Sequence, residues 1–351
     1  MITVSDLSSQ YIEKSKRHIL LIVLISILTL LFAVYSMGTG SSSNLGFWST
    51  LKIILGLEEG SNVQNAIIWD LRFPRILMAI VGGTALATAG ALMQGALGNP
   101  LVSPLTLGVA SGAALGAALA IVLDWTIIEY PPGMTIVLNA FLFSLIVVFI
   151  IIQLGNMRSI SPESYILVGI AITFISGAIV STLQYFATDA QLSALAHWSF
   201  GSLSRPTIEN AILVSMILVI LLPTALVWAW DLNALSMGGD EFAISTGVDP
   251  VKTRKNILIL SALMTSIVIA FTGLIGFVGL AAPHMSRIFV GNDFRKLIPC
   301  SAVLGSFLML FADTVGRTLF APVVIPVGIM LSVIGGPFFM YLLLKKSGGK
   351  F

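Results

Sequence analysis

The chain has 351 residues, of which 57% are hydrophobic and only 10% are charged, and its formal net charge is +2. An ordinary soluble domain has about 25% charged residues, so this composition excludes a water-soluble globular protein and indicates a protein embedded in a lipid bilayer. A single cysteine, Cys300, excludes an internal disulfide and a cysteine-rich metal cluster.

The apolar runs are long enough for membrane helices, which need about 20 residues each. No cleavable signal is expected, because the first apolar run already has full spanning length. We predict an all-α integral membrane protein, with one permease domain over residues 1–351 and ten transmembrane helices. The predicted spans are Ile19–Met37, Ile76–Leu97, Leu105–Leu123, Thr135–Leu154, Tyr165–Phe186, Ala211–Trp230, Ile257–Thr272, Leu274–Phe289, Leu297–Leu319 and Val324–Leu344.

Glycines suggest how these spans pack. Gly108, Gly112 and Gly116 recur every four residues and predict a face on which the third helix approaches a neighbour closely. Gly273 separates the seventh and eighth spans, which are therefore either two short helices joined by a tight turn or one broken helix.

The basic residues predict the orientation of the chain, because they concentrate in cytosolic loops. With a cytosolic N-terminus, thirteen of them fall on the cytosolic side: Lys14, Lys16, Arg17, Arg158, Lys252, Arg254, Lys255, Arg287, Arg295, Lys296, Lys345, Lys346 and Lys350. The other five, Lys52, Arg72, Arg75, Arg205 and Arg317, fall outside. We therefore expect a multi-pass protein of the cell (inner or plasma) membrane with both termini in the cytosol.

A polar stretch, residues 231–256, interrupts the apolar pattern and is predicted to be cytosolic. A short helix is expected over Asp240–Thr246, with Asp240 as its N-cap and Gly247 at its end. Such a helix buries little apolar surface of its own, so we expect it to dock onto a partner. The alternative is an ordinary cytosolic loop.

Few ionisable groups lie within the spans, where they usually mark function. Asp313 and Arg317 are four residues apart and predict an ion pair, and His284 is interpreted as structural. The chain has no GxxxxGK[ST] motif for phosphate binding and no HExxH motif. We therefore expect no catalytic residues and no metal site, and a transporter whose energy comes from another subunit. A stand-alone secondary carrier or channel is the alternative, and a membrane scaffold a third possibility.

Several motifs, in order, resemble those of the FecCD-type permeases, the membrane subunits of binding-protein-dependent ABC importers for iron-siderophores, haem and cobalamin. They are Leu71–Arg75, Gly90–Gln94, Asn99–Pro104, Leu107–Val109, Gly276–Leu280 with Pro283 and His284, Ala312 and Asp313 with Arg317, Pro326–Gly328, and Gly335–Pro337. The resemblance covers almost the whole chain from Leu71 onward.

The resemblance implies a type II ABC importer permease fold and a homodimer with the translocation path between the two copies. It implies two ATP-binding cassette subunits on the cytosolic side, which use ATP and Mg, and an extracytoplasmic substrate-binding protein. The chain itself is expected to bind no cofactor and no nucleic acid. An iron-siderophore is the favoured substrate, and haem, cobalamin or a molybdate-type oxyanion are alternatives.

The resemblance also implies three sets of site residues. ATPase coupling is assigned to Gly239, Asp240, Glu241, Phe242, Ala243, Ile244, Ser245, Thr246 and Gly247. Docking of the binding protein is assigned to Arg72, Arg75 and Arg317, for which anchoring at the lipid headgroups is the alternative. The cytosolic gate is assigned to Asn99, Leu101, Ser161, Pro162, Glu163 and Ser164. Pro162 and Glu163 depart from the family pattern, and a helix start with Ser161 as N-cap explains them equally well.

Overall fold

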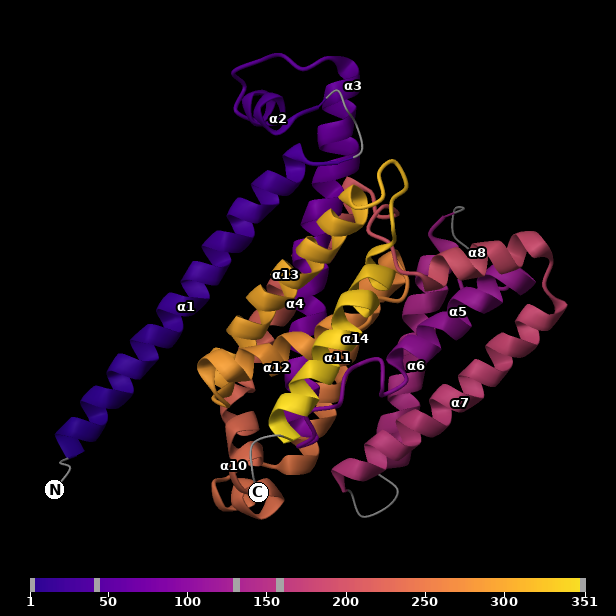
Figure 1. Cartoon of the computed structure of the whole chain (residues 1–351). Helices are drawn as coiled ribbons and strands as arrows, with labels where there is room; N and C mark the ends of the chain where they lie inside the picture. Colours follow the sequence, from indigo (N-terminus) through magenta and orange to yellow (C-terminus); the bar gives the residue numbers. More distant parts are fainter. Residues whose placement is uncertain (1–3, 41–44, 129–132, 156–160, 348–351) are drawn as a thin grey trace.

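The computed structural model describes residues 4–40, 45–128, 133–155 and 161–347, and all regular elements among these residues are helical (Figure 1). The helices are α1 (Val4–Gly38), α2 (Phe47–Ile54), α3 (Asn62–Asn65), η1 (Ala66–Arg72), α4 (Phe73–Ala96), α5 (Val109–Leu123), α6 (Thr135–Gly155), α7 (Pro162–Phe186), α8 (Asp189–Ser199), α9 (Ile208–Val227), α10 (Ala229–Ser245), α11 (Pro250–Thr272), α12 (Val278–Val290), α13 (Phe294–Thr318) and α14 (Val327–Ser347). Arg158 and Lys350, which contribute to the predicted orientation, lie outside the described residues.

Seven helical segments of the described chain are long and apolar enough to cross a membrane. They are Ser9–Gly38, Asn62–Ala96, Thr135–Gly155, Pro162–Phe186, Ile208–Val227, Pro250–Thr272 and Phe294–Thr318. Val109–Leu123 and Val327–Phe338 are apolar but shorter, and α12 has only 13 residues. A helix therefore occurs at each of the ten predicted positions. Among the described residues seven segments have the length and hydropathy of a full span, whereas α5 and α12 have only 15 and 13 residues.

Helix α4 forms the centre of the bundle and packs against α9, α11, α12 and α13. Small residues allow this close packing, because a β-carbon on Gly83 would lie 2.3 Å from the carbonyl oxygen of Gly305. The corresponding distance from Gly90 to the carbonyl oxygen of Gly279 is 1.8 Å. The most buried helix is thus positioned by glycines rather than by large side chains.

Several predicted boundaries differ from the structure; α1 begins at Val4 rather than Ile19, for example, and α11 at Pro250 rather than Ile257. The third apolar helix begins at Val109 rather than Leu105, because Gly108 has φ of +86° and is its N-cap, although a β-carbon there would still lie 3.3 Å from Val147 of α6. Gly112 and Gly116 do contact α6 as predicted. The helix predicted from Ile76 is the last part of a continuous helical segment from Asn62, which includes the π-helix η1.

The seventh and eighth predicted spans are two separate helices. α11 ends at Thr272 and α12 begins at Val278, and the intervening Gly273 and Phe277 have φ of +77° and +69°. This decides between the two alternatives left by the sequence, in favour of two helices joined by a short connection.

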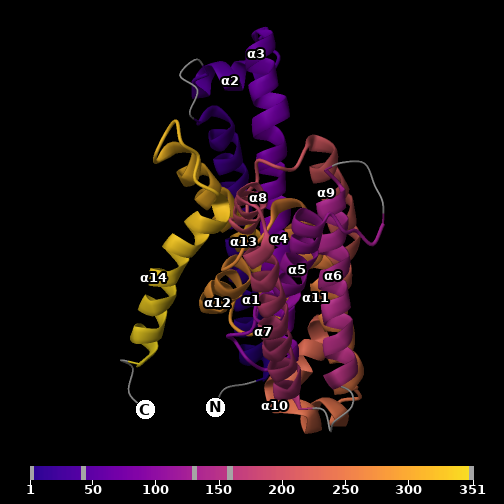
Figure 2. The ribbon, with the colours of Figure 1, turned by 90° about the vertical axis from the view of Figure 1, so that its right-hand side faces the viewer.

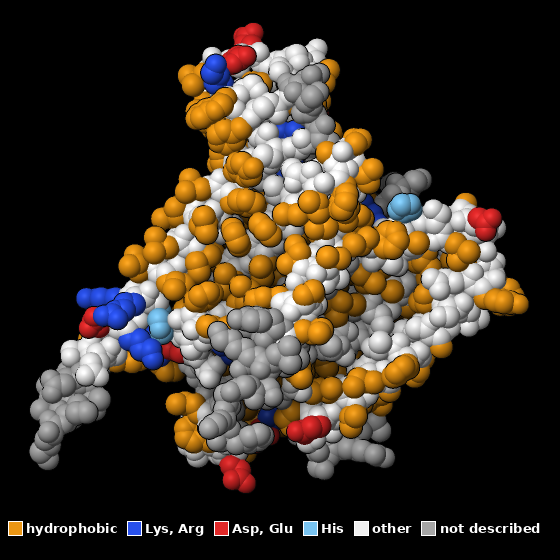
Figure 3. All heavy atoms as spheres, viewed as in Figure 1, with side chains coloured by type: hydrophobic (Ala, Val, Ile, Leu, Met, Phe, Trp, Pro, Cys, Tyr) orange, Lys and Arg blue, Asp and Glu red, His pale blue; other side chains and the backbone are white. Residues whose placement is uncertain are grey.

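The two ends of the bundle carry different structures (Figures 1 and 2). α10, the start of α1 and the end of α14 lie at one end, which we call the α10 end. α2 and α3 lie at the opposite end, which we call the α2 end. On the face shown in Figure 3, hydrophobic side chains cover most of the middle of the molecule.

Candidate functional site

The polar stretch folds into a short helix at the α10 end, as the sequence predicts. α10 is interrupted at Gly238 (φ −152°, ψ 16°) and Gly239 (φ 70°, ψ −158°), so that Asp240–Ser245 forms a separate short helix. Only glycine adopts the Gly239 conformation readily. The helix ends before Gly247, which has φ of +86°. We call Asp240–Ser245 the coupling helix.

The coupling helix buries little apolar surface of its own. Ala243 is fully buried, whereas Phe242 is 41% exposed and Ile244 is 63% exposed. Exposed large apolar side chains outside the apolar middle of a membrane protein indicate a surface that contacts another protein. The prediction that this helix needs a docking partner is consistent with this exposure.

Arg254, on α11, connects the coupling helix to α4. Its guanidinium donates to both carboxylate oxygens of Asp240, with the Nη1 to Oδ2 distance at 2.7 Å. Its Nε donates to the carbonyl oxygen of Ala96, in the last turn of α4, at 2.9 Å. The Asp240 carboxylate is therefore the partner of Arg254, and the structure does not support its predicted role as a helix cap.

The predicted gate residues lie on the two segments next to Arg254. The first segment follows Ala96 directly, and there the Leu101 amide donates to the Asn99 side chain at 2.9 Å. The second is the start of α7, where Ser161 is the N-cap residue and Pro162 the first helical residue. The Ser161 hydroxyl lies 3.3 Å from that of Ser164 and makes no capping bond to the backbone.

Packing and charge bring these two segments together. Glu163 is close enough to Arg254 and Asp240 for electrostatic interaction with both. Leu97 and Tyr165, which flank the two segments, belong to the same buried cluster. The structure thus brings Asp240, of the predicted coupling residues, and Glu163, of the predicted gate, near the same arginine, although they are 77 positions apart in sequence.

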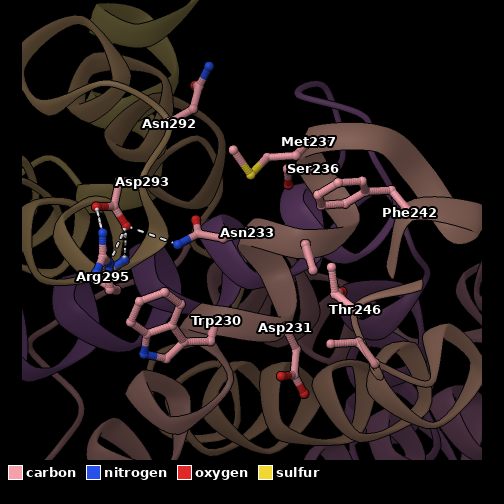
Figure 4. Close-up of a pocket in the computed structure, with 12 residues that line it drawn as sticks. Trp230, Asp231, Asn233, Ser236, Met237, Phe242, Thr246, Asn292, Asp293 and Arg295 are labelled. Carbon is pink, nitrogen blue, oxygen red and sulfur yellow. Dashed lines mark hydrogen bonds and ion pairs between the residues drawn. The ribbon is translucent and has the colours of Figure 1, made fainter. Parts of the chain in front are cut away.

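A cavity of ≈ 790 Å³ lies beside the coupling helix, between α10 and the turn that joins α12 to α13 (Figure 4). Trp230, Met237 and Phe242 supply its apolar wall. Asp293 and Arg295 form an ion pair at 2.7 Å on the side away from Phe242, and the Arg295 guanidinium lies over the Trp230 ring at 4.2 Å (Figure 4).

Asp293 joins the two sides of this cavity. The Asn233 amide donates to its carboxylate at 3.0 Å, and the Phe294 backbone donates to Asn233 at 2.8 Å. Burial alone would raise the pKa of Asp293, but the hydrogen bonds from Arg295 and Asn233 outweigh it and lower this pKa to about 2. The carboxylate therefore remains charged at any physiological pH.

At the α2 end, two of the three arginines assigned to docking contact one buried carboxylate, that of Asp313. Arg75 and Arg317 each donate from Nε to Asp313, at 2.7 and 3.0 Å. Arg72 donates to the carbonyl oxygen of Met37 at 2.6 Å. The predicted ion pair of Asp313 and Arg317 is thus confirmed, with Arg75 as an additional partner.

These arginines point into the protein, which disagrees with anchoring at lipid headgroups. Arg72, Arg75 and Arg317 are 5%, 8% and 5% exposed. All three line one recess of ≈ 430 Å³, which also includes Asp70 and Ser204. The Nη2 atom of Arg75 has no hydrogen-bond partner among the described residues. A role in docking stays a prediction.

Among the described residues, no group of three or more His, Cys, Asp or Glu side chains could hold a metal ion. The sequence did not identify Arg254, Asn233 or Asp293 as site residues. Only the positive charge of Arg254 near the start of a helix, where a base is unfavourable, could have indicated an unusual role for it.

A sequence profile of the FecCD transport family matches residues 27–345. The chain belongs to this family. FecCD proteins are transport permeases, so this member of the family is a multi-pass membrane transport subunit and not an enzyme.

This FecCD permease is similar to proteins from an archaeon and a bacterium. It is 39% identical over 349 residues to a putative ABC transporter permease protein of Methanocaldococcus jannaschii, covering 97% of this chain and 98% of the relative. It is 36% identical over 327 residues to the hemin transport system permease protein HmuU of Yersinia pestis, covering 92% of this chain and 96% of that relative.

A solved structure supports the fold of the permease. An inward-facing conformation of a putative metal-chelate type ABC transporter matches it with a TM-score of 0.80 and 30% identity, over 93% of this chain and 99% of that one. The resemblance found in the sequence motifs is confirmed by these similarities.

Proposed function

We propose that this chain is the membrane-spanning subunit of a binding-protein-dependent ABC importer, which moves a metal chelate across the membrane with energy from separate ATPase subunits. The single observation that carries this proposal is the coupling helix, whose Asp240 is bound through Arg254 to the end of α4. A rigid-body movement of a partner against this helix is passed to the segments that hold Asn99 and Glu163.

The α10 end supplies a suitable surface for an ATPase subunit. The exposed side chains of Phe242 and Ile244 stand beside the cavity lined by Trp230 and Met237. Apolar and aromatic groups next to a recess are the features that dominate binding energy in protein interfaces. ATP and Mg are used by that partner, and the chain itself binds no cofactor.

The recess with Arg72, Arg75 and Arg317 is the corresponding surface for a substrate-binding protein at the α2 end. Three guanidinium groups face two carboxylates, those of Asp313 and Asp70, so the recess has an excess of positive charge. Acidic side chains of a partner fit such a recess.

The proposal also includes ten membrane spans, two copies of the chain and a cytosolic location of the α10 end. The short helices α5 and α12, of 15 and 13 residues, each follow a non-helical connection, at residues 97–108 and 273–277, which covers part of the membrane depth. Non-helical backbone at such depth is tolerated where it is enclosed by protein. The translocation path lies between the two copies.

The names of the similar proteins support the substrate class. One is a hemin permease and another a metal-chelate type transporter. An iron-siderophore remains the favoured substrate, with haem, cobalamin or a molybdate-type oxyanion as alternatives, because the described residues include no group that selects one of them.

The test replaces Asp240–Thr246 with a Gly-Ser linker of equal length. In a complex reconstituted with its ATPase and binding protein, we expect the substrate-stimulated part of ATP hydrolysis to be lost, because the helix no longer transmits force. The matched control carries the same seven-residue replacement at Leu55–Ser61, at the α2 end, and keeps this stimulation. Full stimulation in the first variant, or gradient-driven uptake by the purified chain alone, would remove the proposed function.

A further inference from the structure

A groove with a polar end and an apolar end lies between α1 and α13. Its volume is ≈ 390 Å³. The two helices run in the same direction, because Tyr11 contacts Arg295 near their starts and Ser36 contacts Thr314 near their ends. The lining residues are Tyr11, Ser15, Arg295 and Lys296 towards the α10 end, followed by Ile19, Ile22, Val23 and Pro299 towards the middle of the bundle.

The polar end of the groove has an excess of positive charge. Glu13 is paired with Arg17, and Asp293 already accepts hydrogen bonds from Arg295 and Asn233. Lys296 is only a distant partner of Asp293, with its Nζ 4.0 Å from the carboxylate, and Nζ also lies 5.1 Å from the centre of the Tyr11 ring.

Lys14 adds to this charge. It has no ion pair within 4 Å among the described residues, and both Lys14 and Lys296 are close enough to His18 to interact with it electrostatically. Figure 3 shows Lys and Arg side chains gathered at this level of α1. Lys296 therefore lines the mouth of the groove, and Lys14 lies next to it on α1, between the lining residues Tyr11 and Ser15.

No other part of the described chain covers the groove. α1 leans away from the bundle towards its start, and its exposed apolar residues include Ile19, Leu20 and Val23, at 54%, 59% and 46% (Figure 1). These residues belong to an apolar span, so hydrocarbon surrounds them in a membrane. Tyr11 and Trp230 both contact Arg295, and Tyr and Trp are the side chains enriched at the level of lipid headgroups.

We propose that this groove binds an anionic phospholipid, with its phosphate at Lys296 and Lys14 and one acyl chain along Ile19, Ile22 and Pro299. A phosphate complements the two partly unpaired lysines, and an acyl chain matches the apolar part that follows them along the membrane normal. A soluble anion fits the lysines alone, and an uncharged lipid fits the apolar part alone. This inference does not rest on the proposed transport function.

The test measures lipid bound to the purified full chain in detergent by native mass spectrometry, with dioleoyl phosphatidylglycerol and dioleoyl phosphatidylcholine as probes. We expect tighter binding of the phosphatidylglycerol. Replacing both lysines, Lys14→Gln with Lys296→Gln, leaves the Asp293 hydrogen bonds in place and should weaken that binding roughly tenfold. Ile19→Trp keeps every charge but fills the groove, and should also displace the lipid.

The control pair Lys252→Gln with Lys255→Gln removes the same charge at the start of α11, also near the α10 end, and should leave binding unchanged. Equal loss in this pair would mean attraction to any positive surface and would overturn the proposal. Equal affinity for the two lipids, no effect of Ile19→Trp, or displacement of the lipid by soluble glycerol phosphate would each overturn it as well.

Discussion

At the scale of single residues, Arg254 is the best-supported link between the coupling helix and the predicted gate. Its side chain is only 4% exposed and contacts a carboxylate on one segment and a carbonyl on another. A buried arginine that donates in two directions fixes the distance between its partners, which a flexible lysine with a point charge cannot do. The sequence shows Arg254 only as one of several basic residues near a polar stretch.

Replacing Arg254 with lysine should uncouple hydrolysis from transport. Arg254→Lys retains the positive charge, so Asp240 keeps a counterion, but it loses the two parallel hydrogen bonds and the bond to Ala96. Hydrogen bonds to charged groups contribute about 1.5–3 kcal/mol, which corresponds to a roughly tenfold to hundredfold decrease in the equilibrium constant for the linked arrangement. The number of substrate molecules moved per ATP should therefore fall. The ratio of uptake to hydrolysis in proteoliposomes measures this loss.

Lys252 provides a matched control for this measurement. It is an exposed base on the first turn of the same helix, and Lys252→Ala should leave the ratio unchanged. In a double-mutant cycle, Asp240→Asn should have a smaller effect in the Arg254→Lys background than in the unmodified chain, because the two parallel hydrogen bonds are already lost there. Additive effects of the two substitutions would show that they act separately.

At the scale of elements, the sequence predicts helices well where a glycine or a long apolar run marks them. The helix at Asp240–Ser245 and the separation of the seventh and eighth spans at Gly273 both follow from glycines. The path of the connection after Gly273 cannot be predicted from glycines. Phe277 adopts φ of +69°, which a residue other than glycine reaches only when its surroundings enforce it. Such tertiary constraints leave no local pattern.

Gly273→Ala should therefore destabilise the connection between α11 and α12. Gly273 has φ of +77° and ψ of −167°, and a β-carbon there would lie 2.1 Å from the carbonyl oxygen of Trp198. The backbone conformation alone costs about 1–3 kcal/mol for a residue other than glycine, and the contact adds to this. We expect the midpoint of thermal unfolding of the purified protein to fall by several degrees.

Gly56→Ala separates the two causes of this loss. Gly56 also has a positive φ, +69°, but a β-carbon there meets no atom within 4 Å. The midpoint of thermal unfolding should fall less in Gly56→Ala than in Gly273→Ala, because only the backbone penalty of about 1–2 kcal/mol applies to Gly56→Ala. Equal midpoints for the two variants would mean that the close contact with Trp198 is relieved by movement of the chain.

At the scale of the whole molecule, composition and motif order predict the membrane location, the helical fold and the family. They do not predict which exposed apolar face meets lipid and which meets a second copy, because both environments accept the same side chains. Phe174 on α7 and Val333 on α14 are 75% and 62% exposed, and their sequence environments look alike. The buried group around Asp313 was also only half predicted, since Arg75 is 238 residues away in sequence.

The orientation of the molecule is the last prediction, and it follows from the excess of basic residues near the α10 end. Cys300 is buried, so a Cys300→Ala background supports single cysteines at two exposed glutamates. Glu58→Cys lies at the α2 end and should react with an impermeant maleimide in intact cells. Glu241→Cys, on the coupling helix, should react only in inside-out vesicles. The reverse pattern would place the coupling helix outside the cell, where no ATPase subunit can reach it, and the proposed import mechanism would fail with it.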